Sequence, residues 1–215
     1  EADWEASRLR EEERMMIEME GVGFRGIVEY PLIQIPKGRA TFILGESGSG
    51  KSTLLRLING TAQPTKGVIR LEGADIAQMD GVALRRRVLL VDQTPYLFGG
   101  SIAENVATYY SYRGLQPPSP EAMVRYLALC QAPYTLDRDT EPLSGGERHR
   151  VFLAIFLSFE PEVLMLDEPT AALDEETAMA LMDAITTDCR KRGTTLLVVS
   201  HNRKVAEAYA DGCIT

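Results

Sequence analysis

The segment from Gly45 to Ser52 has the residue types and spacing of a loop that wraps around a phosphate. It reads Gly-Glu-Ser-Gly-Ser-Gly-Lys-Ser, which fits the pattern GxxxxGK[ST]. Glycines in such a loop let backbone N–H groups converge on an anion at the start of a helix, whose dipole favours negative charge. Lys51 would place a positive charge at the β- and γ-phosphates, and Ser52 would offer a hydroxyl ligand to Mg²⁺. The candidate phosphate-binding residues are Gly45, Glu46, Ser47, Gly48, Ser49, Gly50, Lys51, Ser52 and Thr53.

The residues on either side of this loop supply the context that the motif needs. The apolar run Thr41–Leu44 predicts a strand before the loop, and Ser52–Ile58 predicts a helix after it, ended by Gly60. A glycine-rich turn without function has no need of a strand on one side and a helix on the other. The strand–loop–helix order therefore favours a phosphate-binding role.

Two acids follow another apolar run and extend the same chemistry. Asp167 and Glu168 come directly after Val163–Leu166. Asp167 would hold Mg²⁺ through its water shell, and Glu168 would orient or deprotonate an attacking water. Taken alone, two acids at the end of a strand are equally consistent with a helix N-cap. The phosphate loop in the same chain favours the catalytic role.

The elements that must position these residues are predicted by short, unbroken apolar runs. Ala40–Leu44, Val88–Val91, Val163–Leu166 and Leu196–Val199 are continuous rather than alternating, as in strands covered on both faces of a parallel sheet. Between two of them, Glu176–Arg192 places its apolar residues on one helical face. We expect an α/β fold.

Two segments do not follow this alternation of buried strands and helices. Residues 1–20 carry eight acids and three arginines, which predicts an exposed charged helix with Asp3 as a possible N-cap, outside the main domain. Residues 96–142 contain glycine and proline pairs and then a helical pattern over Glu121–Cys130. This second segment is the candidate for an inserted helical subdomain.

Composition excludes several classes of function. The chain has 215 residues and a formal net charge of −8, which argues against a protein that neutralises nucleic-acid phosphates, so we expect no nucleic-acid partner. Its longest apolar run, Val151–Leu157, is far shorter than the roughly 20 residues that cross a bilayer. The three cysteines lack metal-ligand spacing and are expected to be reduced thiols, and the first twenty residues do not resemble a secretory or mitochondrial signal.

A further motif carries a family resemblance. The run Leu143–Glu147 reads Leu-Ser-Gly-Gly-Glu. Its serine, Ser144, lies 167 − 144 = 23 residues before Asp167. Together with the phosphate loop it resembles the signature of ATP-binding cassette (ABC) ATPases. The resemblance covers about residues 21–214 and implies a P-loop NTPase parallel-sheet core, an antiparallel β region and an inserted helical subdomain within a domain over 21–215. It also implies ATP and Mg²⁺ as cofactors, and a further strand or two beyond Thr215.

The resemblance assigns further residues by their position. Gln93 matches a glutamine that contacts Mg²⁺ and reports the γ-phosphate, and Asp174 matches a loop that crosses a dimer interface. His201 matches a histidine that contacts the γ-phosphate and its attacking water, although a lone histidine after a strand is more often an ordinary polar residue. Ser144, Gly145 and Gly146 match a second helix start that binds phosphate in the family. Two such helix starts in one chain imply that a nucleotide is shared with a second copy of the chain, arranged head to tail.

The sequence departs from the family pattern at three positions. Glu147 stands where glutamine is common, and Ile155 stands where arginine is often found; neither removes a group expected to touch phosphate. Gly26 stands where a tyrosine usually stacks on adenine, so Phe24 or Tyr30 would have to substitute, or the base would be held weakly.

We therefore expect the ATPase subunit of a bacterial ABC transporter, at the cytoplasmic side of a separate integral membrane permease. The segments Asp92–Gly99 and Glu141–Glu147 are similar to short stand-alone subunits of iron or metal exporters. One alternative is an ABC ATPase of DNA maintenance or translation, although those relatives carry long insertions or two cassettes. Another is a degenerate cassette that binds ATP without hydrolysing it.

Overall fold

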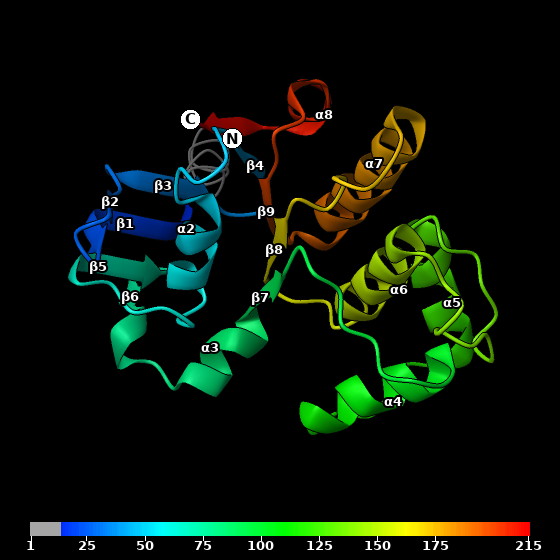
Figure 1. Cartoon of the computed structure of the whole chain (residues 1–215). Helices are drawn as coiled ribbons and strands as arrows, with labels where there is room; N and C mark the ends of the chain where they lie inside the picture. The colour runs from blue at the N-terminus through cyan, green and yellow to red at the C-terminus, as the bar shows by residue number, and fades with distance from the viewer. Residues whose placement is uncertain (1–13) are drawn as a thin grey trace, which may run out of the picture.

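Two sheets lie side by side in the computed structural model of the protein, which describes residues 14–215 (Figure 1). An antiparallel sheet lies on one side, a parallel sheet forms the middle, and most of the helices lie beyond the parallel sheet. Helix α2 (Lys51–Ile58) shares a hydrophobic core with residues of both sheets. The phosphate loop is therefore followed by a helix that is anchored to both sheets.

The antiparallel sheet has the strand order β2-β1-β5-β6, and β3 also pairs with β1. Ile17 and Met19 point into the core while Glu20 is exposed, which is the alternation of a strand covered on one face. The predicted charged helix is therefore wrong for residues 15–20, and Asp3 lies outside the described residues. The strands are β1 (Met15–Phe24), β2 (Val28–Glu29), β3 (Ile33–Pro36), β5 (Lys66–Leu71) and β6 (Ala74–Asp75).

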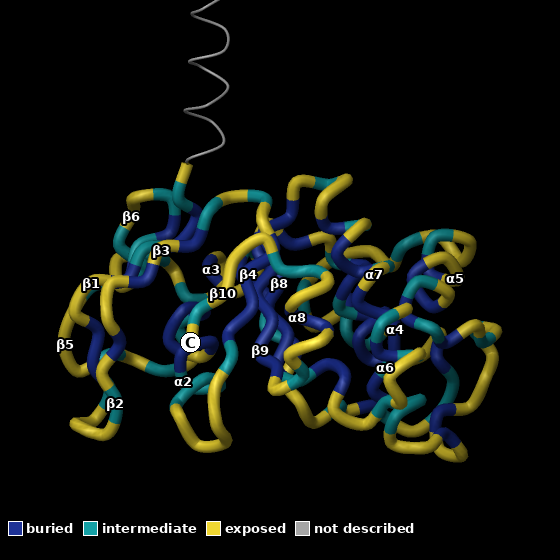
Figure 2. Tube along the Cα trace, turned by 90° about the horizontal axis from the view of Figure 1, so that it is seen from above, coloured by how far each residue is buried: buried dark blue, intermediate teal, exposed yellow. Residues whose placement is uncertain are grey.

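The parallel sheet confirms the prediction drawn from the continuous apolar runs. Its strand order is β10-β4-β9-β8-β7, and every neighbouring pair is parallel. Successive residues of β8 enter opposite cores: Leu164 and Leu166 face one, whereas Val163 and Met165 face the other. Figure 2 shows the central strands β4, β8 and β9 in the buried colour, and every residue of these three strands is buried. The strands are β10 (Gly212–Ile214), β4 (Ala40–Ile43), β9 (Thr195–Val199), β8 (Val163–Asp167) and β7 (Val88–Val91).

All the α-helices except α2 begin after a residue whose side chain accepts an N–H of the first turn, whereas α2 begins after Gly50 and has no side-chain cap. Helix α7 starts after Asp174, whose carboxylate accepts the N–H of Thr177, and ends at Gly193, whose left-handed φ of 70° suits glycine. A short 3₁₀ turn covers Ile76–Gln78. The α-helices that follow α2 are α3 (Gly81–Arg87), α4 (Ile102–Tyr112), α5 (Pro120–Leu129), α6 (Gly145–Leu157), α7 (Glu175–Arg192) and α8 (Arg203–Tyr209).

Helices α4 and α5 both lie within segment 96–142, and both pack against α6. The predicted helix over Glu121–Cys130 is confirmed by α5. Phe152 and Phe156 of α6 contact the ring of Tyr109 in α4, at centroid distances of 5.9 and 5.3 Å. No helix among residues 14–215 is long and apolar enough to cross a membrane.

Candidate active site

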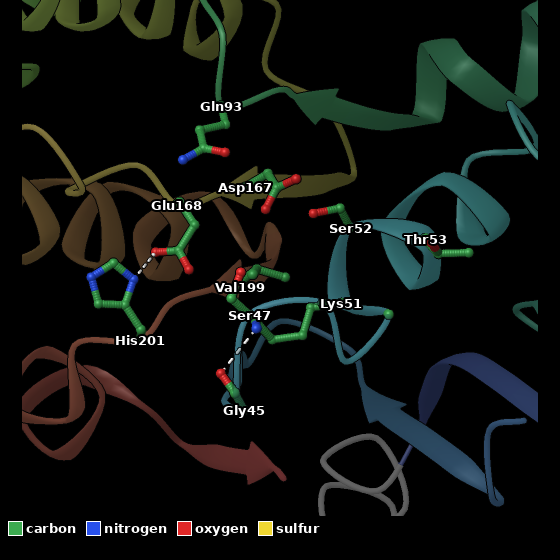
Figure 3. A pocket seen from close by; sticks show the side chains of 12 residues that line it. Gly45, Ser47, Lys51, Ser52, Thr53, Gln93, Asp167, Glu168, Val199 and His201 are labelled. Atoms are coloured by element: carbon green, nitrogen blue, oxygen red, sulfur yellow. Dashed lines mark hydrogen bonds and ion pairs between the residues drawn. The ribbon is translucent and has the colours of Figure 1, made fainter. Parts of the chain in front are cut away.

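The carboxyl ends of β4, β8 and β9 meet at one edge of the parallel sheet, and a cleft of about 490 Å³ opens there (Figure 3). Open α/β sheets bind ligands at this edge, because the loops that leave the strands converge there. Most of the predicted site residues are brought together in the cleft. Its lining residues are Gly45, Ser47, Gly48, Gly50, Lys51, Ser52, Thr53, Gln93, Asp167, Glu168, Val199 and His201.

The phosphate loop connects β4 to α2. Gly48 and Gly50 have φ values of 82° and 94°, which glycine adopts far more readily than other residues. Nζ of Lys51 donates to the carbonyls of Gly45, at 2.9 Å, and Glu46, at 2.7 Å. The ammonium group is therefore held over the loop itself, within the cleft. Of the predicted loop residues, Glu46 and Ser49 do not line the cleft.

Asp167 ends β8 and is 5% exposed. Its Oδ1 is buried and has no hydrogen-bond partner in the described part of the chain. Burial raises the pKa of this carboxyl, and a hydrogen bond with the Ser52 hydroxyl acts in the opposite direction. A buried carboxylate oxygen without a partner, beside a hydroxyl, suits a hard cation such as Mg²⁺.

A cation bound by Asp167 would need further ligands that are not carboxylates of this chain. Within residues 14–215 there is no cluster of three or more histidine, cysteine or acidic side chains able to hold a metal ion. Mg²⁺ commonly binds one or two carboxylates together with phosphate oxygens and waters. Asp167, Ser52 and Gln93 fit this pattern, in which the nucleotide completes the coordination shell.

Glu168 is held in an uncommon backbone conformation. Its φ is 51°, in the left-handed region, and its N–H donates to the carbonyl of Val199 at 3.0 Å. Its Oε2 lies 2.9 Å from Nδ1 of His201 and accepts no hydrogen bond from the described residues. Both side chains point into the cleft (Figure 3). The Glu168 carboxylate is therefore held beside the His201 imidazole at the wall of the cleft.

Gln93 and His201 come from the ends of two other strands. Gln93 lies two residues after β7, and the largely exposed His201 lies two residues after β9. Both line the cleft. Their contacts with Mg²⁺ and the γ-phosphate, which the family pattern implies, stay predictions. Val199 also lines the cleft but was not predicted as a site residue. Its part in the site is a backbone one, because its carbonyl accepts the N–H of Glu168, and a backbone contact leaves no signal in the residue type.

The signature residues lie elsewhere. Ser144 caps α6 in a reciprocal arrangement with Glu147, and Gly145 and Gly146 form its first turn. The carboxylate of Asp174 accepts both the N–H and the hydroxyl of Thr177, at the start of α7. None of these four predicted residues lines the cleft. Their contact with a nucleotide held by a second copy stays a prediction.

Glu147 has a defined role in this helix start. Its carboxylate accepts the N–H of Ser144 at 2.7 Å and the hydroxyl of Tyr134 at 2.6 Å. The hydrogen bonds from Ser144 and Tyr134 lower the pKa of Glu147 to about 2. Glutamine, which is common at this position in the family, can also complete a capping box of this kind. The departure from the family pattern therefore preserves the helix start.

The residues considered for base stacking are not equivalent. Gly26 lies in the exposed turn between β1 and β2, with a φ of 68°. Tyr30 is 9% exposed and its hydroxyl donates to the carbonyl of Gly50, so its ring is not free to stack on a base. Phe24 is half-buried, and the guanidinium of Arg25 lies 5.1 Å from its ring centroid.

Comparison with known proteins decides the family. The model of the family described as "ABC transporter" matches residues 32–171, which is more than half of the chain. The chain belongs to the ABC transporter family. It is an ATP-binding domain of the ATPase type that these transporters share.

Two curated relatives show how widely this domain is used. The chain is 42% identical over 180 residues to "ABC transporter I family member 17" of Arabidopsis thaliana, covering 83% of this chain and 68% of the relative. It is 35% identical over 185 residues to "Methionine import ATP-binding protein MetN 2" of Burkholderia pseudomallei. That match again covers 83% of this chain, but the chain spans only 46% of the MetN 2 length.

Two solved structures share the fold of this ABC domain. One is cbiO1 from Clostridium perfringens, described as part of the ABC transporter complex cbiONQ, with a TM-score of 0.80 and 28% identity. The match covers 93% of this chain and 83% of cbiO1. The other is a bacterial Atm1-family ABC exporter with ATP bound, with a TM-score of 0.81, 26% identity, and coverage of 91% of this chain and 36% of that chain.

Proposed function

We propose that this chain is the ATP-hydrolysing subunit of an ABC transporter and that it drives a separate integral membrane permease. One observation carries the proposal: Lys51, Asp167, Glu168 and His201 come from different segments and converge on one cleft. A domain that used ATP only as a structural clamp would not need Glu168 and His201 in contact there. Their proximity supports hydrolysis over simple binding.

The proposed reaction transfers the γ-phosphoryl group of ATP to water: the bond from the γ-phosphorus to the β–γ bridging oxygen breaks, and ADP leaves with that oxygen. Lys51 and the N–H groups of the loop offset the charge of the β- and γ-phosphates, and Glu168 accepts a proton from the attacking water. His201 contacts the γ-phosphate beside that water. Ser52, Gln93 and Asp167 would hold Mg²⁺, which would add positive charge beside the phosphate oxygens.

We propose that the permease contacts the surface beside Gln93. Asp92 and Arg113 line a neighbouring pocket of about 460 Å³ outside the active-site cleft. The nearby rings of Tyr96 and Tyr112 are 63% and 73% exposed, and each packs against Phe98. Exposed aromatic side chains are enriched in protein interfaces. A partner seated there would be linked to the γ-phosphate through Gln93, at the cytoplasmic face of the membrane.

The transported substrate would be read by the permease rather than by this chain. We propose export of a metal such as iron, supported by the similarity of Asp92–Gly99 and Glu141–Glu147 to subunits of such exporters. Related proteins carry both import and export in their names, so the shared fold is compatible with either direction. Purifying the chain with its native membrane partner, and measuring metal uptake into inside-out vesicles, tests the direction.

Steady-state phosphate release tests hydrolysis, with Glu168→Gln as the informative variant. The substitution keeps side-chain volume but removes the base, so turnover should fall by about 10²–10⁴, the range typical of general-base loss. Mg²⁺–ATP binding should persist. The matched control is Glu20→Gln on β1, which only weakens an exposed ion pair with Arg70.

A Glu168→Gln protein with near-normal turnover would reject Glu168 as the base and direct attention to Gln93 or His201. An unmodified protein that binds ATP but releases no phosphate would instead support the structural clamp. Copurification with DNA or ribosomes in place of a membrane protein would favour an ATPase of DNA maintenance or translation.

A further inference from the structure

Tyr30 makes a hydrogen bond that none of the roles assigned above explains. Its hydroxyl donates to the carbonyl of Gly50 at 2.8 Å, from a side chain that is 9% exposed. The same carbonyl accepts the N–H of Leu54 at 2.9 Å, as the first bond of α2. A carbonyl oxygen has two lone pairs, so both acceptor sites of Gly50 are filled. The orientation of this peptide group is thereby held from two directions.

That orientation determines where the next N–H points. The peptide bond between Gly50 and Lys51 is planar and trans, so the N–H of Lys51 is directed opposite to the carbonyl of Gly50. The carbonyl points along α2, and the N–H therefore points out of the N-terminus of the helix, where the cleft lies. It is one of the helix-start donors that have no partner within the helix.

The packing around Gly50 makes this contact specific. Gly50 has a φ of 94°, and a Cβ atom placed there would lie 3.0 Å from Oη of Tyr30 and 3.1 Å from Cγ2 of Val28. The side chains of Tyr30 and Val28 thus pack directly against the backbone of the phosphate loop at Gly50. Burial raises the pKa of Tyr30 to about 12, so the hydroxyl remains a donor at neutral pH.

We propose that Tyr30 is a positioning residue for phosphate binding: it fixes the Gly50–Lys51 peptide so that the N–H of Lys51 faces the nucleotide phosphates. The proposal rests on the phosphate-binding role of the loop described under the proposed function. It assigns Tyr30 to the phosphates rather than to the base. Its contribution must then be the same for any ligand that carries the triphosphate group.

Tyr30→Phe tests the proposal because it keeps the ring and removes only the hydroxyl. Binding of Mg²⁺–ATP and of Mg²⁺–tripolyphosphate, which has no base, is measured by titration calorimetry. Loss of one hydrogen bond that orients a donor should weaken both ligands by about two- to tenfold and by equal factors. Thermal unfolding without ligand reports the effect on the fold alone.

Tyr110→Phe is the matched control. The Tyr110 hydroxyl also donates to a backbone carbonyl, that of Ser158 at 2.7 Å, and its side chain is 5% exposed. It does not line the cleft, so its loss should lower stability while leaving both dissociation constants unchanged. A merely structural role for Tyr30 predicts the same behaviour as Tyr110→Phe.

Two results would overturn the role of Tyr30 without affecting the proposed function. One is unchanged affinity of Tyr30→Phe for both ligands. The other is weaker ATP binding with unchanged tripolyphosphate binding, which would assign Tyr30 to the base. In both, the unmodified protein still binds the two ligands. If the unmodified protein binds neither ligand, the phosphate-binding role fails as well, and the two failures are thereby distinguished.

Discussion

At the scale of single residues, Lys51 is the main positive charge in the cleft, and its ammonium group is held by two loop carbonyls. Lys51→Ala should weaken Mg²⁺–ATP binding by at least about tenfold, because hydrogen bonds to charged groups contribute about 1.5–3 kcal/mol. Hydrolysis should fall too, since the same charge acts in the transition state. Nucleotide titration measures the first effect and phosphate release the second.

Lys37→Ala is the control for this variant. Lys37 is a half-exposed lysine whose Nζ lies 2.8 Å from Glu72, away from the cleft, so its loss should leave nucleotide binding unchanged. Undiminished ATP binding by Lys51→Ala would show that the loop does not bind phosphate in the way described.

Glu168 adopts a strained backbone conformation directly after β8. A non-glycine residue with a left-handed φ of 51° is destabilised by about 1–3 kcal/mol. The bond from its N–H to the Val199 carbonyl holds this conformation against β9. The carboxylate and His201 are brought together as a result.

At the scale of elements, the turn between β1 and β2 determines how much the base contributes to nucleotide affinity. Gly26 offers no ring, and Tyr30 is committed to Gly50, so most of the binding energy should come from the triphosphate and Mg²⁺. Dissociation constants for ATP and GTP should lie within about a factor of ten, or 1.4 kcal/mol. Titrating both nucleotides under identical Mg²⁺ concentrations tests this expectation.

Gly26→Tyr provides a gain-of-function comparison for the same element. The exposed turn has no atom within 4 Å of a Cβ built at Gly26, although its φ of 68° makes any side chain strained there. A tyrosine able to stack should tighten ATP and GTP binding and leave tripolyphosphate unchanged. A preference of the unmodified protein for ATP by several powers of ten would mean that Phe24 or another residue recognises the ring.

At the scale of the whole molecule, the two helix starts that are predicted to bind phosphate do not line the same cleft. The start of α2 lines the cleft, whereas Ser144 and Gly146 at the start of α6 do not. We therefore expect a second copy, arranged head to tail, to bring its Ser144 to the γ-phosphate held by Lys51. Two chains of net charge −8 repel each other, so association should require the nucleotide.

Light scattering on Glu168→Gln tests this assembly. The variant should be a dimer with Mg²⁺–ATP and a monomer or weak dimer with Mg²⁺–ADP, because loss of the γ-phosphate removes the bridge between the copies. Ser144→Ala combined with Glu168→Gln is the control and should weaken the ATP-dependent dimer. A monomer at ATP concentrations that saturate the site would count against a shared nucleotide.

The sequence by itself determined the features that depend on local patterns. The phosphate loop, the acids after β8 and the buried parallel strands were predictable because glycine spacing, helix starts and continuous apolar runs act over a few neighbouring residues. Only the tertiary structure decided the contacts between distant segments. Residues 15–20 were predicted to be helical from their charge, yet they form a strand because pairing with β3 and β5 buries Ile17 and Met19. Tyr30 likewise reaches Gly50 only because the antiparallel sheet packs beside α2, a contact that no local spacing encodes.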